Sequence, residues 1–243
     1  MAHLYYVPAG EPLEAGAPAR LLGDQARHAA SVARLSVGES VLIGDGAGTL
    51  GHATATAGSP EGVDLMVHST DSHPKPESEV WLVQALAKGD RDELAIQTCT
   101  ELGVDRIIPW QAARSVPVWK GEKADKGVLR WQKIASEAAK QSLRPWIPVV
   151  EPILTTADLA ALDGDHQLVL LDPEAIDSVP AYIPPRGRPI LVIVGPEGGV
   201  EPAEREVLLD AGAVDLRLGS TILRTSSAGP AALALLNSSM GRW

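Results

Sequence analysis

The chain has 243 residues, of which 45% are hydrophobic, and a formal net charge of −10. This composition supports one large domain or two small ones and excludes general disorder. No uncharged apolar run reaches the roughly 18 residues that a membrane-spanning helix needs, and the acidic balance argues against a protein that coats nucleic acid without specificity.

The cysteine content and the amino-terminal segment predict a cytoplasmic protein. Cys99 is the single cysteine, so the chain can form no disulfide framework. The segment Met1–Tyr6 lacks the basic stretch and long apolar run of a signal peptide. Cys99 falls in a predicted helix, where we expect a packed small residue and not a nucleophile.

Residues 1–72 predict a small β-barrel. Short alternating runs at Val41–Ile43, His52–Ala57 and Val63–His68 are typical strands, and one helix is expected from Asp24 to Leu35. The segment Gly46–Gly51 fits the dinucleotide pattern G-x-G-x-x-G, but an alternating strand and not a helix follows it. We therefore expect a hairpin turn there, with a nucleotide-binding oxidoreductase as the alternative.

A linker is expected at Ser69–Ser78, which contains Pro74 and Pro76, and the chain then changes character. Strands alternate with helices to the end, which predicts an α/β domain over residues 73–243 with a parallel sheet covered on both faces. The predicted strands are Val80–Leu86, Arg106–Trp110, Gln167–Leu171, Ile190–Val194 and Asp215–Leu218. The predicted helices are one from an Asp90 N-cap to Leu102, Ala124–Leu143, one after Glu201, and Ser227–Ser238 with Pro230 in its first turn.

Two glycine turns follow strong strands of this predicted sheet. Gly195-Pro196-Glu197-Gly198-Gly199 follows the apolar run Ile190–Val194, and Gly219 follows Leu218. Glycine permits a left-handed backbone and close approach of a ligand to the main chain. Because ligands of open α/β sheets bind at the carboxyl ends of strands, the two turns predict a pocket. The first turn lacks the Lys-Ser/Thr of a P-loop, so an NTPase is not expected.

The segment 106–150 is basic although the whole chain is acidic, with 9 Lys and Arg against 3 Asp and Glu. In the predicted helix Ala124–Leu143 and just beyond it, five cations recur at spacings that share one face: Lys126, Arg130, Lys133, Lys140 and Arg144. Such a row is either a solvated face or a phosphate-binding surface. Arg114 lies upstream of it, and Trp119, in a predicted loop, could stack on a base or pack, whereas Trp131 shares a helical face with Ile134 and is expected in the core.

The chain offers little for metal or nucleophilic chemistry. Its six histidines form no metal-ligand spacing and no cysteine cluster assists them, so no metal site is predicted. Ser226-Ser227 lacks the G-x-S-x-G context of a serine nucleophile, and helix capping explains these serines better.

The motifs taken together resemble one known family. The segments Ile193–Gly199 and Leu218–Arg224 are similar to the S-adenosylmethionine segments of SPOUT methyltransferases. The segments Gln84–Arg91, Thr100–Val104 and Arg130–Ser142, with Ala113–Val116, narrow the resemblance to the 16S ribosomal RNA uridine-N3 methyltransferases, the RsmE family. The similarity covers nearly the whole chain, with a barrel resembling a PUA domain first. A non-catalytic RNA-binding protein that kept the fold is the alternative.

This resemblance implies a fold, a cofactor and an assembly. It implies a deep trefoil knot in the second domain, a homodimer with active sites at the subunit interface, and S-adenosylmethionine as the cofactor. Adenine would lie among main-chain groups of Leu171, Gly195, Leu218 and Leu223, with apolar contact from Ile222 and Leu223. The cofactor-binding residues implied are Leu171, Gly195, Pro196, Glu197, Gly198, Gly199, Leu218, Gly219, Ile222 and Leu223.

The resemblance also implies 16S ribosomal RNA of the small subunit as substrate. Its phosphates would be held by Arg114, Lys126, Arg130, Lys133 and Arg144. For methyl transfer to uridine N3, Arg114 and Arg224 would stabilise the developing oxyanion on a uracil carbonyl. Glu197 is the only carboxylate in the glycine turns, and we expect it to hold its turn and not to act as a base. The chain departs from the family at Ser226-Ser227, where Glu-Thr is common, and at Thr98, where Lys is common.

Overall fold

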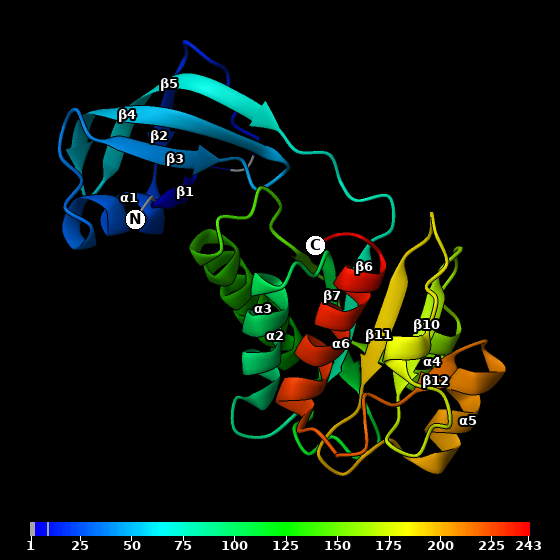
Figure 1. Cartoon of the computed structure of the whole chain (residues 1–243). Helices are drawn as coiled ribbons and strands as arrows, with labels where there is room; N and C mark the ends of the chain where they lie inside the picture. The colour runs from blue at the N-terminus through cyan, green and yellow to red at the C-terminus, as the bar shows by residue number, and fades with distance from the viewer. Residues whose placement is uncertain (1–2, 9) are drawn as a thin grey trace. The chain divides into compact units, whose positions relative to one another are not determined.

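The computed structural model describes residues 3–8 and 10–243, so Met1 and Ala2 of the amino-terminal segment lie outside it. The chain divides into two compact units. The first comprises Met1–Lys75 and Ala139–Ile147, and the second comprises Pro76–Ala138 and Pro148–Trp243. Figure 1 labels most of the helices and strands of both units.

The first unit is built on a five-stranded sheet in the order β1-β3-β4-β5-β2. β1 pairs with β3 in parallel, and the other pairs are antiparallel. Alternate side chains such as Ala53 and Ala55 point into the core and have almost no exposed surface. The three predicted strands are confirmed, whereas closure into a barrel stays a prediction. The strands are β1 Leu4–Tyr6, β2 Pro18–Leu21, β3 Ser40–Gly44, β4 Thr49–Ser59 and β5 Gly62–Ser72.

The helix of the first unit is shorter than the sequence predicted. α1 (Gly23–Arg27) continues as the π-helix η1 (His28–Val32), in which Ala33 N–H donates to His28 O over 2.8 Å. The prediction of a helix to Leu35 was wrong, because Arg34 adopts φ 53° and turns the chain. The predicted linker also begins later, since β5 extends to Ser72.

The segment Gly46–Gly51 is a hairpin turn followed by a strand, as its sequence context predicted. Asp45 Oδ1 accepts hydrogen bonds from the N–H groups of Ala47 at 2.7 Å and Thr49 at 2.9 Å, which fixes the turn between β3 and β4. A Cβ at Gly46 would meet Ile147 at 2.6 Å, and one at Gly48 would meet the Trp146 ring at 2.5 Å. The side chains of Ile147 and Trp146 therefore occupy the space beside these two glycines, and this space does not hold a nucleotide.

The second unit contains a seven-stranded sheet in the order β12-β10-β11-β6-β7-β8, with β9 beside β7, and all of its pairings are parallel. The predicted parallel α/β sheet is confirmed. β11 lies between β6 and β10, and its five residues are all buried, which explains its continuous apolar sequence. The strands are β6 Val80–Ala85, β7 Arg106–Gln111, β8 Val149–Val150, β9 Leu154–Thr155, β10 Gln167–Leu171, β11 Ile190–Val194 and β12 Val214–Leu216.

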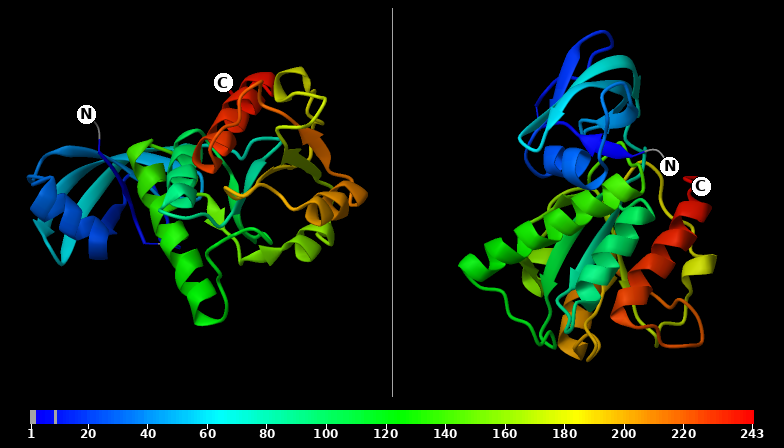
Figure 2. Two further views of the ribbon diagram at one scale, coloured as in Figure 1. Left: turned by 90° about the horizontal axis from the view of Figure 1, so that it is seen from below. Right: turned by 90° about the vertical axis from the view of Figure 1, so that its left-hand side faces the viewer.

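Helices cover both faces of this sheet, as predicted (Figure 2). Leu82 of β6 belongs to the hydrophobic cluster that contains Trp131 of α3 and Leu236 of α6, while Val83 belongs to the cluster with Leu208 of α5 on the other face. Successive residues of β6 thus point into different cores on opposite faces of the sheet. The helices are α2 Arg91–Glu101, α3 Glu122–Gln141, α4 Thr156–Ala160, α5 Pro202–Asp210 and α6 Thr225–Ser239, with the 3-10 turn η2 at Val179–Ala181.

Asp90 is the N-cap residue of α2, as predicted, but it adopts φ 58° and makes no side-chain cap hydrogen bond. Asp92 Oδ1 accepts from the Glu93 N–H instead. The prediction that Pro230 lies in the first turn of the last helix was wrong. Pro230 lies beyond the first turn of α6, because the helix begins at Thr225, two residues before its predicted start. Within the described residues, no helix is long and apolar enough to cross a membrane.

Candidate active site

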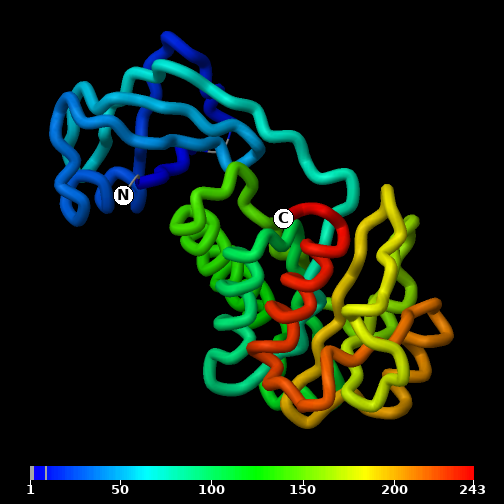
Figure 3. Tube along the Cα trace, in the orientation of Figure 1, coloured from blue at the N-terminus to red at the C-terminus, as the bar shows by residue number. Residues whose placement is uncertain are grey.

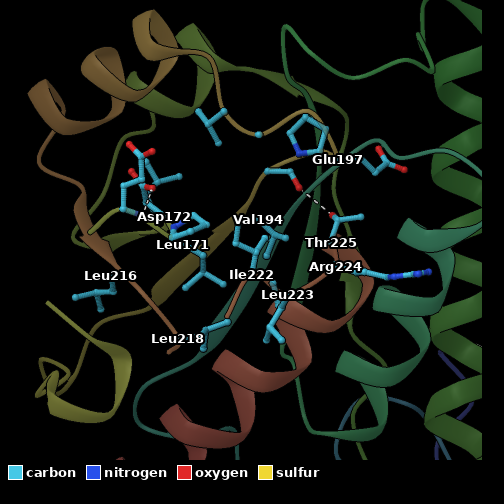
Figure 4. A pocket seen from close by; sticks show the side chains of 18 of the residues that line it. Leu171, Asp172, Val194, Glu197, Leu216, Leu218, Ile222, Leu223, Arg224 and Thr225 are labelled. Carbon is cyan, nitrogen blue, oxygen red and sulfur yellow. Dashed lines mark hydrogen bonds between the residues drawn. The ribbon is translucent and has the colours of Figure 1, made fainter. Parts of the chain in front are cut away.

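A cavity of about 1020 Å³ lies in the second unit at the carboxyl ends of β10 and β11 and beside the segment between β12 and α6 (Figure 4). Parallel strands of an open sheet commonly place a ligand at this edge. The cavity brings together nine of the ten residues predicted to bind a cofactor: Leu171, Gly195, Pro196, Glu197, Gly199, Leu218, Gly219, Ile222 and Leu223. The tenth, Gly198, is not among the lining residues, and its carbonyl accepts a hydrogen bond from Arg114.

The first turn of the cavity, residues 195–199, depends on glycine for two different reasons. Gly199 adopts φ +73° in open space, so its requirement comes from the left-handed backbone. Gly198 lies close to a neighbour instead, since a Cβ there would meet the Arg114 Cβ at 3.3 Å. The Gly199 N–H closes the turn by donating to Pro196 O over 2.9 Å. The turn therefore presents main-chain groups and little side-chain bulk to the cavity.

The second loop, residues 217–224, contributes apolar side chains. Ile222 is 81% exposed and Leu223 is 38% exposed, although both line the cavity. Leu171 at the end of β10 and Leu218 are half-buried and add to the same lining. Figure 4 views these side chains together around the pocket. An apolar wall beside accessible main-chain groups suits a flat heteroaromatic ring.

Four arginines line the cavity: Arg91, Arg114, Arg205 and Arg224. Arg114, in the turn that follows β7, donates through Nη1 to Gly198 O over 2.9 Å. Arg224 is exposed and precedes α6 as its N-cap residue. Arg91 was absent from the predicted site, although it ends Gln84–Arg91, one of the segments that resemble the family. Guanidinium groups gathered at one cavity can bind an anion or a polarised carbonyl.

Glu197 is engaged by its neighbours. Its Oε1 accepts hydrogen bonds from the Lys88 N–H at 3.0 Å and from Arg91 Nη1 at 2.8 Å. Burial opposes ionisation, but the hydrogen bonds from its own backbone, from Lys88 and from Arg91 outweigh it and lower the pKa of the carboxyl. A carboxylate with a lowered pKa is a weak base, so this geometry favours the role of holding the turn.

A charged cluster at the cavity was not predicted from the sequence. Arg205 of α5 donates through Nε to Asp172 Oδ2 over 2.7 Å and pairs with Asp215 of β12. Asp172 and Arg205 both line the cavity. The available signal was Asp172-Pro173 directly after a predicted strand. These contacts tie α5 to the ends of β10 and β12 and so hold that side of the cavity.

The predicted basic row does not form one continuous face. Lys126, Arg130 and Lys133 are exposed on α3, but Lys140 is only 5% exposed, so its inclusion in a solvent-facing row was wrong. The helix ends at Gln141, and Arg144 belongs to the first unit. Arg130 also pairs with Glu93 through a contact of 2.5 Å between Nε and Oε1, and Lys126 pairs with Glu122 at 3.3 Å.

Two tryptophans and the single cysteine have structural roles. Trp119 packs edge-on against Trp131, with ring centroids 5.1 Å apart, and a Cβ at Gly127 would meet its ring at 2.6 Å. Trp131 is 1% exposed and lies in the core, as predicted. Cys99 is completely buried, and burial raises the pKa of its thiol, which agrees with a packed residue.

Two family models match the chain. A model described as an RNA methyltransferase domain matches residues 73–237, and one described as an RNA methyltransferase PUA domain matches residues 21–65. The first of these covers more than half of the chain and includes every residue that lines the cavity.

Curated relatives and solved structures agree with these matches. The chain is 38% identical to ribosomal RNA small subunit methyltransferase E of Mycobacterium bovis, with 100% of this chain and 94% of the relative covered. It is 33% identical to the Bacillus subtilis protein of the same name, with 89% and 88% covered. A crystal structure of the Neisseria gonorrhoeae protein of that name, bound to S-adenosyl methionine, has a TM-score of 0.88 and 28% identity, with 98% of each chain covered.

Proposed function

The chain belongs to the family of ribosomal RNA small subunit methyltransferases E, and we propose that it transfers the methyl group of S-adenosylmethionine to N3 of a uridine in 16S ribosomal RNA. The observation that carries this proposal is the cavity of about 1020 Å³ at the carboxyl ends of β10 and β11. Its two loops combine main-chain groups with an apolar wall, and this combination fits an adenosyl group. When bound, S-adenosylmethionine supplies an electrophilic methyl group on a sulfonium.

The residues of the cavity suggest how the chain assists the reaction. The uracil N3 would receive the methyl group that bound S-adenosylmethionine supplies, the sulfonium would leave as a neutral thioether, and the N3 proton would pass to solvent. Arg114 and Arg224 stabilise the negative charge that develops on a uracil carbonyl as N3 loses its proton. Glu197 remains ionised and holds the turn through Lys88 and Arg91. Catalysis then depends on positioning and electrostatics.

Binding of the RNA would use the cations Arg114, Lys126, Arg130, Lys133 and Arg144. The exposure of Lys126, Arg130 and Lys133 supports contact with phosphates. Replacing either Arg130 or Lys133 by Ala is expected to weaken binding and to lower the salt slope by about one unit. If neither variant changes the affinity or the slope, these side chains are only solvated.

The resemblance and the family matches support three further features. Residues 1–72 form a PUA-like RNA-binding barrel, and residues 73–243 form the methyltransferase domain, whose family match begins at residue 73. The chain is knotted between β11 and α6; supporting this, the chain leaves β12 at the sheet edge and returns as α6 over β11 and β6 (Figure 3). A knot would reduce the end-to-end distance that the unfolded chain reaches when it is stretched by its ends.

The protein acts as a cytoplasmic homodimer in this proposal. The 81% exposure of Ile222, an apolar residue beside the cavity, supports a partner subunit that covers this loop. Light scattering should give twice the mass of the chain, and Ile222→Asp should shift the mass toward the monomer. A monomeric wild-type protein would contradict the dimer but leave the methyltransferase proposal intact.

The decisive experiment supplies S-adenosylmethionine with bare 16S RNA and, separately, with assembled small subunits, and maps the methylated base. Product at uridine N3 in either substrate supports the proposal. RNA binding without methylation would indicate a non-catalytic RNA-binding protein. Calorimetry that detects binding of NAD but not of S-adenosylmethionine would overturn the cofactor assignment.

A further inference from the structure

Gln84 is a fully buried polar residue at the carboxyl end of β6 that the proposed chemistry leaves unused. Its exposure is 0%, and in the sheet it pairs with Val194, the last residue of β11. Its amide Nε2 donates to Ala85 O at 3.0 Å and to Thr225 Oγ1 at 2.8 Å. Its Oε1 is buried without a hydrogen-bond partner among the described residues. Burial of an amide oxygen without a hydrogen bond costs free energy, so a polar residue at this position needs a structural or functional explanation.

The hydroxyl of Thr225 connects Gln84 to the first turn of the cavity. Thr225 is 6% exposed and is the first residue of α6, directly after the loop 217–224. Its Oγ1 donates to Gly195 O over 2.9 Å. A threonine hydroxyl carries one proton, so the Gln84 amide must be the donor in the other contact. No side-chain cap hydrogen bond forms at the start of α6, and the hydroxyl is directed to the end of β11.

We infer that Gln84 and Thr225 are positioning residues that fix the spacing between the two loops of the cavity, 195–199 and 217–224. Gly195 opens the first loop and Thr225 follows the second, so one hydroxyl holds both against the end of β6. Gly195 and Thr225 also line the cavity themselves. A site that binds through main-chain groups has little side-chain freedom with which to adjust, so its affinity depends on loops that are held in place before binding.

The inference rests on the proposed function, because its readout is the affinity for S-adenosylmethionine. Thr225→Val keeps the shape of the side chain and removes the hydroxyl, which leaves Gln84 Nε2 and Gly195 O short of a partner. We expect calorimetry on the full chain to give a dissociation constant about tenfold higher, or about 1.4 kcal/mol. Thr225→Ser should restore the affinity to nearly the wild-type value. Affinity for 16S RNA, measured without cofactor, should not change.

A matched control separates positioning from stability. Asn237 lies near the other end of α6, is 1% exposed, and donates through Nδ2 to Leu102 O over 2.7 Å. Asn237→Leu removes a buried hydrogen bond from the same helix away from the cavity. It should lower the melting temperature but leave the affinity for S-adenosylmethionine unchanged.

A second variant keeps the inference testable if Thr225→Val does not fold. Gln84→Met removes the donor at similar length and should weaken cofactor binding in the same direction. The double variant should bind S-adenosylmethionine no more weakly than the single variant with the lower affinity, because both substitutions remove the same contact between Gln84 and Thr225. Wild-type affinity in Thr225→Val, or an equal loss in Asn237→Leu, would overturn the inference. A wild-type protein that does not bind S-adenosylmethionine would contradict the proposed function itself.

Discussion

The guanidinium of Arg91 donates a hydrogen bond of 2.8 Å to the carboxylate of Glu197, which lies 106 positions later in the chain. The contact joins the start of α2 to the glycine turn after β11. The side chain of Glu197 is 28% exposed and that of Arg91 is 43% exposed, so the pair is reachable by solvent. Glu197 therefore remains a carboxylate that is already engaged, which is a poor starting point for removing a proton from a substrate.

This pairing predicts how stability depends on pH. The pKa of Glu197 in the folded protein lies below its ordinary value of 4.5, so its stabilising contribution is present above about pH 4.5 and is lost as the pH falls through the folded-state pKa. Glu197→Gln should lower the free energy of unfolding at neutral pH, with the difference from wild type shrinking in acid. Denaturant unfolding from neutral to acidic pH measures this difference in the free energy of unfolding. The exposed Glu206 provides the control, since Glu206→Gln should give no such trend.

Glu197→Gln should also keep measurable turnover, because in the proposed mechanism the proton leaves to solvent. Cofactor affinity is expected to fall moderately as the turn loosens. Abolished turnover, in a variant that folds and binds the cofactor normally, would identify Glu197 as the base.

The rate of methyl transfer should rise with pH as the target uridine ionises. In the proposed mechanism Arg114 stabilises the uracil anion, so Arg114→Ala should lower kcat by on the order of 10²-fold while cofactor affinity changes less. Single-turnover rates measured against pH, together with calorimetry, separate these effects. Arg186→Ala removes an exposed arginine that does not line the cavity and should change neither quantity. A flat pH profile would count against solvent as the proton acceptor.

Releasing Arg130 from Glu93 should strengthen RNA binding. The ion pair, with 2.5 Å between Nε and Oε1, competes with a phosphate for the same guanidinium. Glu93→Gln removes the competing charge, and because exposed ion pairs contribute little, affinity should rise by no more than about fivefold. Filter binding at several salt concentrations measures it. The matched control is Asp165→Asn, which removes the partner of Arg188 in a contact outside the basic row and should leave RNA affinity unchanged.

Gly199→Val should abolish cofactor binding while the fold survives. A Cβ at Gly199 meets nothing within 4 Å, but its φ of +73° costs an L-residue roughly 1–2 kcal/mol, and a β-branched side chain more. The turn is expected to relax by moving its main chain away from the cavity. Gly212→Val imposes the same strain at φ +91°, after α5 and outside the cavity lining, and should lower stability without changing cofactor affinity. Equal affinities for the wild type and Gly199→Val would remove the turn from the site.

The sheet and the cavity could be predicted because their signals are local. The run Ile190–Val194 is buried on both faces, so its sequence is continuously apolar, and the glycine turn follows it directly. β8 and β9 have two residues each, too few for any periodicity to appear. The pairs Arg91–Glu197 and Arg205–Asp172 join residues that only the fold brings together. Lys140 is buried although its spacing along the helix placed it in the row of exposed cations.

The segment 139–147 delays completion of the first unit during synthesis. Tyr6 donates through its hydroxyl to Arg144 O over 2.7 Å, and Leu4 and Tyr6 share a hydrophobic cluster with Ala139. Gly46 O accepts from the Ile147 N–H at 3.0 Å in the same unit. A ribosome that has released only residues 1–75 has therefore delivered an incomplete unit with these surfaces uncovered. About seventy further residues must be synthesised before the first unit can complete its folding.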